Sequence, residues 1–221
     1  MKAIIFDLDQ TLIDRTETVR KFLNDQYIRF DTELSCSQES FVTTVMHNQK
    51  NGYADKLIAY EESMQELTES VEAEALFTDF KATYGLDGVL FPGIKEMLAQ
   101  VSEHYVLAMI TNGRSKGQNA KIDSEGIRQY FQVIKVSEEE GIKKPNEEIY
   151  LRCLADLGLS AEECIFIGDH PQSDVATPKK LGMKAIWIRS EHYDEPEEAD
   201  LVIDCASDLI GHLNSELFLQ D

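Results

Sequence analysis

Six short apolar runs, rich in isoleucine and valine, recur along this 221-residue chain and constrain its fold more than any other feature. They lie at residues 3–6, 105–110, 132–136, 164–167, 184–188 and 201–203. Each run is too short for a helix and lacks clean polar–apolar alternation, which is typical of strands buried on both faces. Helical patterns separate most of the runs, as at 150–157, where Gly158 follows as a helix end. The sequence therefore predicts an α/β protein with a parallel sheet covered by helices on both faces.

One long stretch interrupts this strand–helix rhythm. Between residues 15 and 84 no strand is predicted, and helical patterns follow one another instead. One apolar stripe at helical spacing consists of Val19, Phe22, Leu23, Tyr27 and Phe30. Three more helices are predicted within 41–46, 57–67 and 71–84, and Asn51-Gly52 is typical of a turn. An insertion this long exceeds a crossover between neighbouring strands, so we expect a core of residues 1–14 and 85–221 with an all-α domain at 15–84.

Charge and cysteine content exclude several classes of function. The chain has 41 acidic and 21 basic side chains, for a formal charge of −20. Such a surface repels polyanions, so we expect no nucleic acid and no membrane as partner. Four cysteines without CxxC spacing favour buried free thiols in a reducing compartment. The first apolar run is too short for a signal peptide, and no run reaches the ~18 residues of a membrane span, so we expect a cytoplasmic protein.

Polar side chains follow four of the predicted strands at or near the point where each strand ends. They are Asp7 and Asp9 after the first run, Thr111 and Asn112 after the second, Lys143 and Lys144 beyond the third, and Asp169 and Asp174 after the fourth. Ligands of open parallel sheets bind outside the carboxyl ends of the strands. We therefore expect these side chains to gather at one edge of the sheet.

The acidic residues of this set point to a metal. Asp7 and Asp9 are two residues apart in extended chain, which places both carboxylates on one side. Like charges this close resist joint ionisation unless a cation lies between them. With Asp169 and Asp174 added, the set favours a hard cation bound through oxygen. Mg²⁺ fits best, because it takes one or two carboxylates together with waters and phosphate oxygens.

The remaining polar groups point to phosphoryl transfer. A lysine, a threonine hydroxyl and the N–H groups at 112–113 can bind the oxygens of a phosphate and neutralise its charge. A carboxylate nucleophile can form an aspartyl-phosphate and so divide hydrolysis into two steps. A second carboxyl can protonate the leaving oxygen and later accept a proton from water.

Four segments of the chain resemble, in order, the motifs of the haloacid dehalogenase-like hydrolase superfamily. They are DLDQT at 7–11, ITNG at 110–113, KKP at 143–145 and GDHPQSD at 168–174. The resemblance implies a Rossmann-like core with an α-helical cap inserted after the first motif. It implies Asp7 as nucleophile and Asp9 as general acid and base. It also implies Thr111 and Lys144 at the substrate phosphate, and we add Asn112 to this phosphate-binding set.

The resemblance also implies a metal site and a choice of lysine. Mg²⁺ is expected at the Asp7 carboxylate, the Asp9 backbone carbonyl and Asp169, with Asp174 in support. Of the two adjacent lysines we choose Lys144, the one next to the proline. Downstream of the last motif, we expect residue 177 to cap a short helix with a proline in its first turn.

The function expected is Mg²⁺-dependent hydrolysis of a small phosphorylated metabolite through an aspartyl-phosphate. A phosphomutase or another phosphotransferase of the superfamily is the alternative. A dehalogenase would need neither Mg²⁺ nor the second carboxylate, Asp9. A non-catalytic phosphate acceptor or binding module is a remote alternative, because Asp7 follows the first strand rather than a middle one. The sequence predicts neither the particular substrate nor the oligomeric state.

Overall fold

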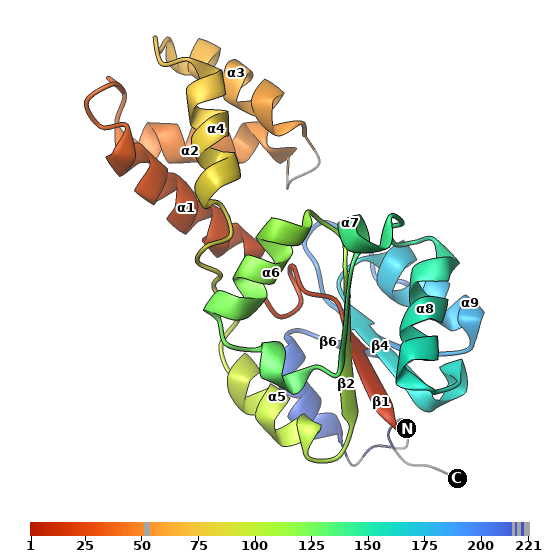
Figure 1. Ribbon diagram of the computed structural model, residues 1–221. Coiled ribbons are helices and arrows are strands. Elements are labelled where there is room, and N and C mark those ends of the chain that lie inside the picture. The colour runs from red at the N-terminus through yellow and green to blue at the C-terminus, as the bar shows by residue number, and fades with distance from the viewer. Residues whose placement is uncertain (51–53, 214, 216–217, 219–221) are drawn as a thin grey trace. The chain divides into compact units, whose positions relative to one another are not determined.

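The computed structural model describes residues 1–50, 54–213, 215 and 218 of the chain. Within them the chain divides into two compact units. The sheet unit comprises Met1–Asp14 together with Gly88–Asp221, and the helical unit comprises Arg15–Asp87. Figure 1 shows both, coloured along the chain.

One parallel six-stranded sheet forms the centre of the sheet unit, in the order β3-β2-β1-β4-β5-β6. The strands are β1 (Ala3–Phe6), β2 (Val106–Thr111), β3 (Val133–Val136), β4 (Cys164–Gly168), β5 (Lys184–Ile188) and β6 (Leu201–Ile203). Each coincides with a predicted apolar run to within one residue at either end. The α/β fold with a Rossmann-like parallel sheet is therefore confirmed. The strand order reverses direction at β1, which pairs with both β2 and β4.

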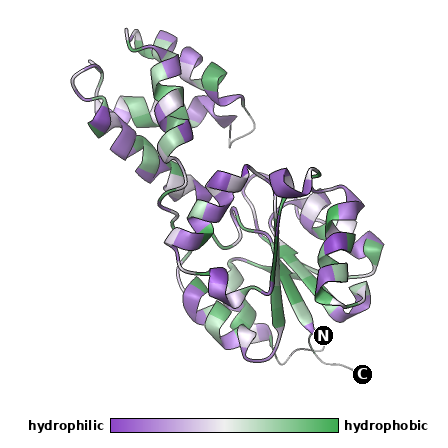
Figure 2. Ribbon diagram, viewed as in Figure 1, coloured by the Kyte–Doolittle hydropathy of each residue, from purple (hydrophilic) through white to green (hydrophobic). Residues whose placement is uncertain are grey.

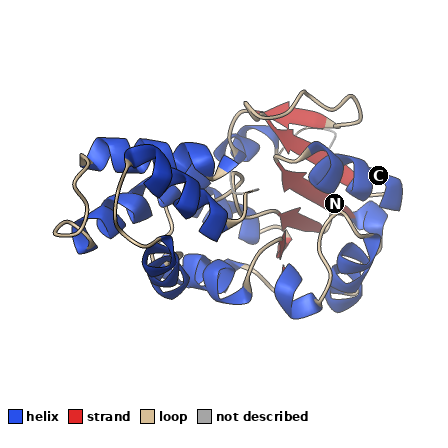
Figure 3. Ribbon diagram, turned by 90° about the horizontal axis from the view of Figure 1, so that it is seen from above, coloured by secondary structure: helices blue, strands red, loops and turns tan. Residues whose placement is uncertain are grey.

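Helices cover both faces of this sheet (Figure 3). They are α5 (Ile94–Ser102), α6 (Ser115–Ser124), α7 (Ser137–Glu140), α8 (Glu147–Leu157) and α9 (Thr177–Leu181), with short helical turns at η2 (Arg128–Tyr130), η3 (Ala161–Glu163) and η5 (Ala206–His212). Alternate strand residues point to opposite sides. Ile4 packs in one apolar cluster with α5 and α6, and Ile5 packs in another with α8. Figure 2 shows the apolar strands enclosed between these helices.

A π-helical segment, η4 (Pro171–Ala176), runs directly into α9. The prediction that Thr177 caps α9 is wrong, because Ala176 holds the cap position and is itself helical. The Thr177 hydroxyl instead donates to the carbonyl of Gln172 at 3.0 Å. Since helical backbone continues from η4 into α9, no free helix start remains there for a side chain to cap. Pro178 does lie in the first turn of α9, as expected.

Among the described residues of the helical unit, which omit 51–53, four helices form: α1 (Arg15–Arg29), α2 (Gln38–Asn48), α3 (Lys56–Leu67) and α4 (Ala73–Thr83). They pack around an apolar cluster of their own, which includes Phe22, Phe41 and Leu76. Inside it, the buried amide of Gln26 accepts from the Tyr60 hydroxyl at 2.7 Å, which joins α1 to α3. The turn predicted at residues 51–52 lies outside the described residues.

Two further sequence predictions concern the whole chain. All four cysteines are free thiols, but two of them, Cys36 and Cys205, are only partly buried. Across the described ranges, no helix has the length and hydrophobicity that crossing a bilayer requires.

Candidate active site

The predicted polar residues lie where the central strands end. Asp7 follows β1 directly, Thr111 is the last residue of β2, and Asp169 follows β4. All three strands run parallel, so these residues share the carboxyl edge of the sheet. This edge, next to the strand at which the sheet order reverses, is the usual ligand site of open α/β sheets.

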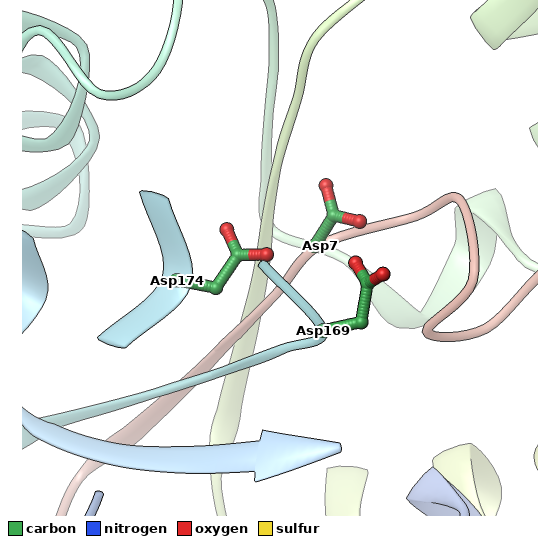
Figure 4. Close-up of side chains that lie close together, drawn as sticks. All are labelled: Asp7, Asp169 and Asp174. Carbon is green, nitrogen blue, oxygen red and sulfur yellow. The ribbon is translucent and has the colours of Figure 1, made fainter. Parts of the chain in front are cut away.

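Three carboxylates converge at this edge. Oxygen atoms of Asp7, Asp169 and Asp174 all lie within 4.8 Å of one another (Figure 4). Burial, opposed by Lys144 and reinforced by Asp174, raises the pKa of Asp7 to about 7. Burial and the charges of Asp174 and Asp7 raise the pKa of Asp169 to about 8. A tight set of oxygen donors with excess negative charge fits a hard divalent cation such as Mg²⁺.

Lys144 is the cation that the fold brings to this cluster. Its Nζ atom donates to Oδ1 of Asp7 and to Oδ1 of Asp174, both at 2.7 Å, and the residue is 4% exposed. Burial acts to lower the pKa of Lys144, but the carboxylates of Asp174 and Asp7 outweigh it and raise the pKa. The ammonium also lies 5.1 Å from the centre of the Phe166 ring. Its neighbour in sequence, Lys143, is exposed.

Asn112 contacts the backbone of Lys144 through both ends of its side-chain amide. Its Nδ2 donates to the Lys144 carbonyl at 3.0 Å, and its Oδ1 accepts from the Lys144 N–H at 2.9 Å. The N–H of Gly113, which the sequence placed at a phosphate oxygen, donates instead to the Ser137 hydroxyl at 2.9 Å. Asn112 therefore joins the end of β2 to the loop that carries Lys144.

Asp9 lies outside the cluster of three carboxylates, and its side chain is bound by helix α6. Lys121 Nζ donates to Asp9 Oδ1 at 2.5 Å, and Gln118 Nε2 donates to Asp9 Oδ2 at 2.9 Å. Gln118 Nε2 also donates to the Thr111 hydroxyl at 2.6 Å. Because the Thr111 oxygen accepts that bond, its own proton can be donated to a ligand. The sequence analysis did not predict Gln118 or Lys121 as site residues. Their i, i+3 spacing shortly after ITNG places both on one face of a helix, which is the only indication that the sequence gives.

A backbone N–H and Lys144 together hold Asp174, which is 1% exposed. Its Oδ2 accepts from the His170 N–H at 3.0 Å. Its carboxylate also fills the space beside Gly168, where an added Cβ would overlap it. Any side chain at position 168 therefore displaces the carboxylate. The Trp187 indole N–H donates to the Asp169 carbonyl at 2.6 Å and fixes the neighbouring backbone.

The sequence profile of the haloacid dehalogenase-like hydrolases matches residues 4–188, and the chain belongs to this family. N-acylneuraminate-9-phosphatase of Mus musculus is 28% identical over 204 residues, which cover 85% of this chain and 82% of that protein. Glyceraldehyde 3-phosphate phosphatase of Pyrococcus furiosus is 28% identical over 232 residues, with 98% and 94% covered. The predicted superfamily is thus confirmed, and these relatives support the class of phosphoric monoester hydrolases.

Solved structures agree on the fold. The putative hydrolase YfnB from Bacillus subtilis, bound to magnesium, superimposes with a TM-score of 0.80 at 20% identity and covers 96% of this chain and 98% of its own. A 2-haloacid dehalogenase from Pseudomonas syringae gives a TM-score of 0.62 at 23% identity, with 96% and 98% covered. At such identities the likeness shows the fold alone.

Proposed function

We propose that this chain is a Mg²⁺-dependent phosphatase that hydrolyses a small-molecule phosphate monoester through a phosphate ester on Asp7. The observation that carries the proposal is the charge balance at the carboxyl edge. One ammonium, that of Lys144, contacts two of three converging carboxylates, which leaves the buried cluster with excess negative charge. A phosphate dianion would add to that excess. The site therefore needs a divalent cation before it can bind such a substrate.

The fit to Mg²⁺ rests on the donor set. Asp7, Asp169 and Asp174 offer oxygen ligands and no sulfur or nitrogen, the choice that this hard ion prefers. Asp7 and Asp169 are the side chains proposed to hold it, together with the Asp9 carbonyl. A bound Mg²⁺ would neutralise charge shared between the carboxylates and the phosphate oxygens. Asp174 accepts hydrogen bonds from Lys144 and from the His170 N–H, and we propose that it holds Lys144 in place beside Asp7.

The proposed first step is attack by the Asp7 carboxylate on phosphorus. As the new bond between oxygen and phosphorus forms, the bond to the leaving group breaks, and its electron pair goes to the leaving oxygen. The carboxyl of Asp9 donates its proton to that oxygen. In the second step water attacks the same phosphorus and gives a proton to Asp9, while the bond between phosphorus and the Asp7 oxygen breaks and its electron pair returns to Asp7. Inorganic phosphate leaves, and Asp7 returns to its carboxylate form.

Two cationic or donor groups stabilise the phosphate in both steps. Lys144 neutralises Asp7 in the resting site and the phosphate oxygens during transfer. The Thr111 hydroxyl, whose oxygen is occupied by Gln118, donates its proton to a phosphate oxygen. Such fixed donors act on charge that develops in the transition state, where they contribute most to the rate. Asn112, which the sequence predicts at the substrate, is proposed to act through Lys144 instead.

We place the substrate among small phosphorylated metabolites. The named relatives include a sugar-acid phosphatase, a triose phosphatase and, at 25% identity, the pyrimidine 5'-nucleotidase YjjG of Escherichia coli. The substrates in these names share a phosphate monoester on a small organic molecule, and they differ in the organic part. A phosphomutase would return the phosphate to a sugar rather than to water.

The test is phosphate release from a panel of metabolite monoesters with Mg²⁺ and with EDTA. We expect release from one or a few compounds, loss of release in EDTA and recovery on adding excess Mg²⁺. Asp7→Asn should abolish release while the far-ultraviolet circular dichroism spectrum stays unchanged. No release from any compound, or release indifferent to EDTA, would refute the proposal. Chloride release from 2-chloropropionate would identify a dehalogenase instead.

A further inference from the structure

Helix α6 carries two buried polar side chains that the proposed reaction does not use directly. Lys121 is 1% exposed and Gln118 is 5% exposed. Residues at i and i+3 lie on one face of a helix, so both can reach the same neighbour. That neighbour is Asp9, 109 positions from Gln118 and 112 from Lys121 in sequence.

A buried ammonium is retained in a protein only where a partner offsets its loss of hydration. Lys121 contacts Asp9 Oδ1, and Gln118 contacts Asp9 Oδ2, so each carboxylate oxygen has its own donor from α6. Apolar side chains at positions 118 and 121 would pack on the sheet without the desolvation cost of a buried ammonium or amide. The two polar residues therefore serve the carboxylate they hold.

Gln118 connects Asp9 to a second proposed active-site group. The same Nε2 atom donates to Asp9 at 2.9 Å and to the Thr111 hydroxyl at 2.6 Å. One amide thus fixes the separation between the carboxyl proposed to move a proton and the hydroxyl proposed to bind phosphate. Donors at both oxygens fix the orientation of the Asp9 side chain, which would otherwise rotate about its bonds.

We propose that Lys121 and Gln118 are positioning residues that hold the Asp9 carboxyl in line with the leaving oxygen of a phosphate held at Thr111. The inference rests on the proposed function and deepens it. In the step concerned, the bond from phosphorus to the leaving oxygen breaks while Asp7 bonds to phosphorus. The electron pair stays on the leaving oxygen, and the proton of Asp9 joins it there. A displaced Asp9 therefore slows the reaction most for substrates whose leaving oxygen needs a proton in order to depart.

The experiment compares two substrates of similar shape, phenyl phosphate and p-nitrophenyl phosphate. p-Nitrophenolate departs without a proton, and phenolate depends far more on one. The constant kcat/KM covers only the steps up to leaving-group departure, so slow breakdown of the phosphoenzyme does not affect it. For Lys121→Met, we expect kcat/KM on phenyl phosphate to fall about 100-fold or more, the usual contribution of a placed acid. On p-nitrophenyl phosphate the fall should stay below about tenfold. Gln118→Leu also releases the Thr111 hydroxyl, so its kcat/KM should fall on both substrates and fall further on phenyl phosphate.

Controls separate positioning from damage to the fold. Lys116→Met changes an exposed lysine of the same helix and should leave both constants unchanged. Equal losses on the two substrates, or no loss, in both variants would overturn the inference, because a structural role lowers both rates alike. If the unaltered protein cleaves neither compound and no member of the metabolite panel, the proposed function fails instead. The two failures are therefore distinguishable.

Discussion

The ammonium of Lys144 lies 2.7 Å from Oδ1 of Asp7, although 137 positions separate the two residues in sequence. The contact joins the loop after β1 to the segment between β3 and α8. A second bond of equal length joins the same ammonium to Asp174, after β4. The Lys144 side chain thus joins the segments that follow β1, β3 and β4, and it contributes to both the charge balance and the geometry of the site.

Replacing this lysine should affect activity and stability together. For Lys144→Met we expect kcat to fall by about 10²–10³, as when one fixed donor to a developing charge is removed. In the metal-free protein, the unpaired buried carboxylates should lower the free energy of unfolding by about 3–5 kcal/mol. Steady-state kinetics and urea denaturation measure the two effects. Lys143→Met is the matched control, and a larger effect there than at 144 would reverse our choice of lysine.

Removing the amide of Asn112 tests whether it acts through Lys144. Asn112→Ala loses the two hydrogen bonds to the Lys144 backbone. We expect the free energy of unfolding to fall by about 1–3 kcal/mol, and kcat to fall more than KM rises. A large rise in KM with kcat unchanged would show instead that Asn112 binds the substrate, as we first expected from the sequence.

Metal-free protein should lose stability as pH rises. The folded pKa values of Asp7 and Asp169, about 7 and about 8, exceed those of unfolded aspartate, about 3.9. Between these limits the folded state binds more protons than the unfolded state, so the free energy of unfolding declines from about pH 4 to about pH 8. In EDTA we expect a lower melting temperature at pH 8.5 than at pH 6.

Mg²⁺ should counter that decline, because an ion that binds only the folded state stabilises it. The rise in melting temperature on adding Mg²⁺ should be larger at pH 8.5 than at pH 6. Asp169→Asn removes one of the repelling charges, so in EDTA it should melt higher than the unaltered protein at pH 8.5 and respond little to Mg²⁺. An equal response to Mg²⁺ in the variant would exclude Asp169 as a ligand.

The close approach of Gly168 to Asp174 gives a steric prediction. In Gly168→Ala the new Cβ overlaps the Asp174 carboxylate. We expect a loss of about 1–3 kcal/mol in the free energy of unfolding, together with reduced kcat, because the partner of Lys144 is displaced. Gly117→Ala, in α6 with nothing within 4 Å of its added Cβ, should be neutral or stabilising. Similar losses in both variants would show that overlap between a Cβ at position 168 and the Asp174 carboxylate is not the cause.

Local pattern was sufficient for the strands and for the residues at their ends. Short apolar runs rich in isoleucine and valine are typical of buried parallel strands. The carboxyl ends of such strands share one edge of the sheet, so the sequence could predict that Asp7, Asp169 and Asp174 lie together. Lys144 could be preferred over Lys143 only through the resemblance to a family motif. The structure brings Lys144 to Asp7 and leaves Lys143 exposed.

What the sequence did not reveal depends on partners distant in the chain. The polar pattern of α6 is typical of a solvated helix, and the i, i+3 spacing of Gln118 and Lys121 does not by itself indicate that Lys121 is buried against Asp9. Asn112 stands in a motif that suggests phosphate binding, and only the fold shows its amide on the Lys144 backbone. Thr177 had the composition of a cap, but a π-helical turn before it removes the free helix start.

The most direct test of the account is chemical capture of the phosphorylated intermediate. The protein would be acid-quenched during turnover and treated with borohydride, which reduces an aspartyl-phosphate to homoserine, and its peptides would be sequenced by mass spectrometry. We expect homoserine at position 7 and unaltered aspartate at Asp9 and Asp169. An active preparation in which Asp7 stays unmodified, or in which another residue carries the change, would contradict the central claim.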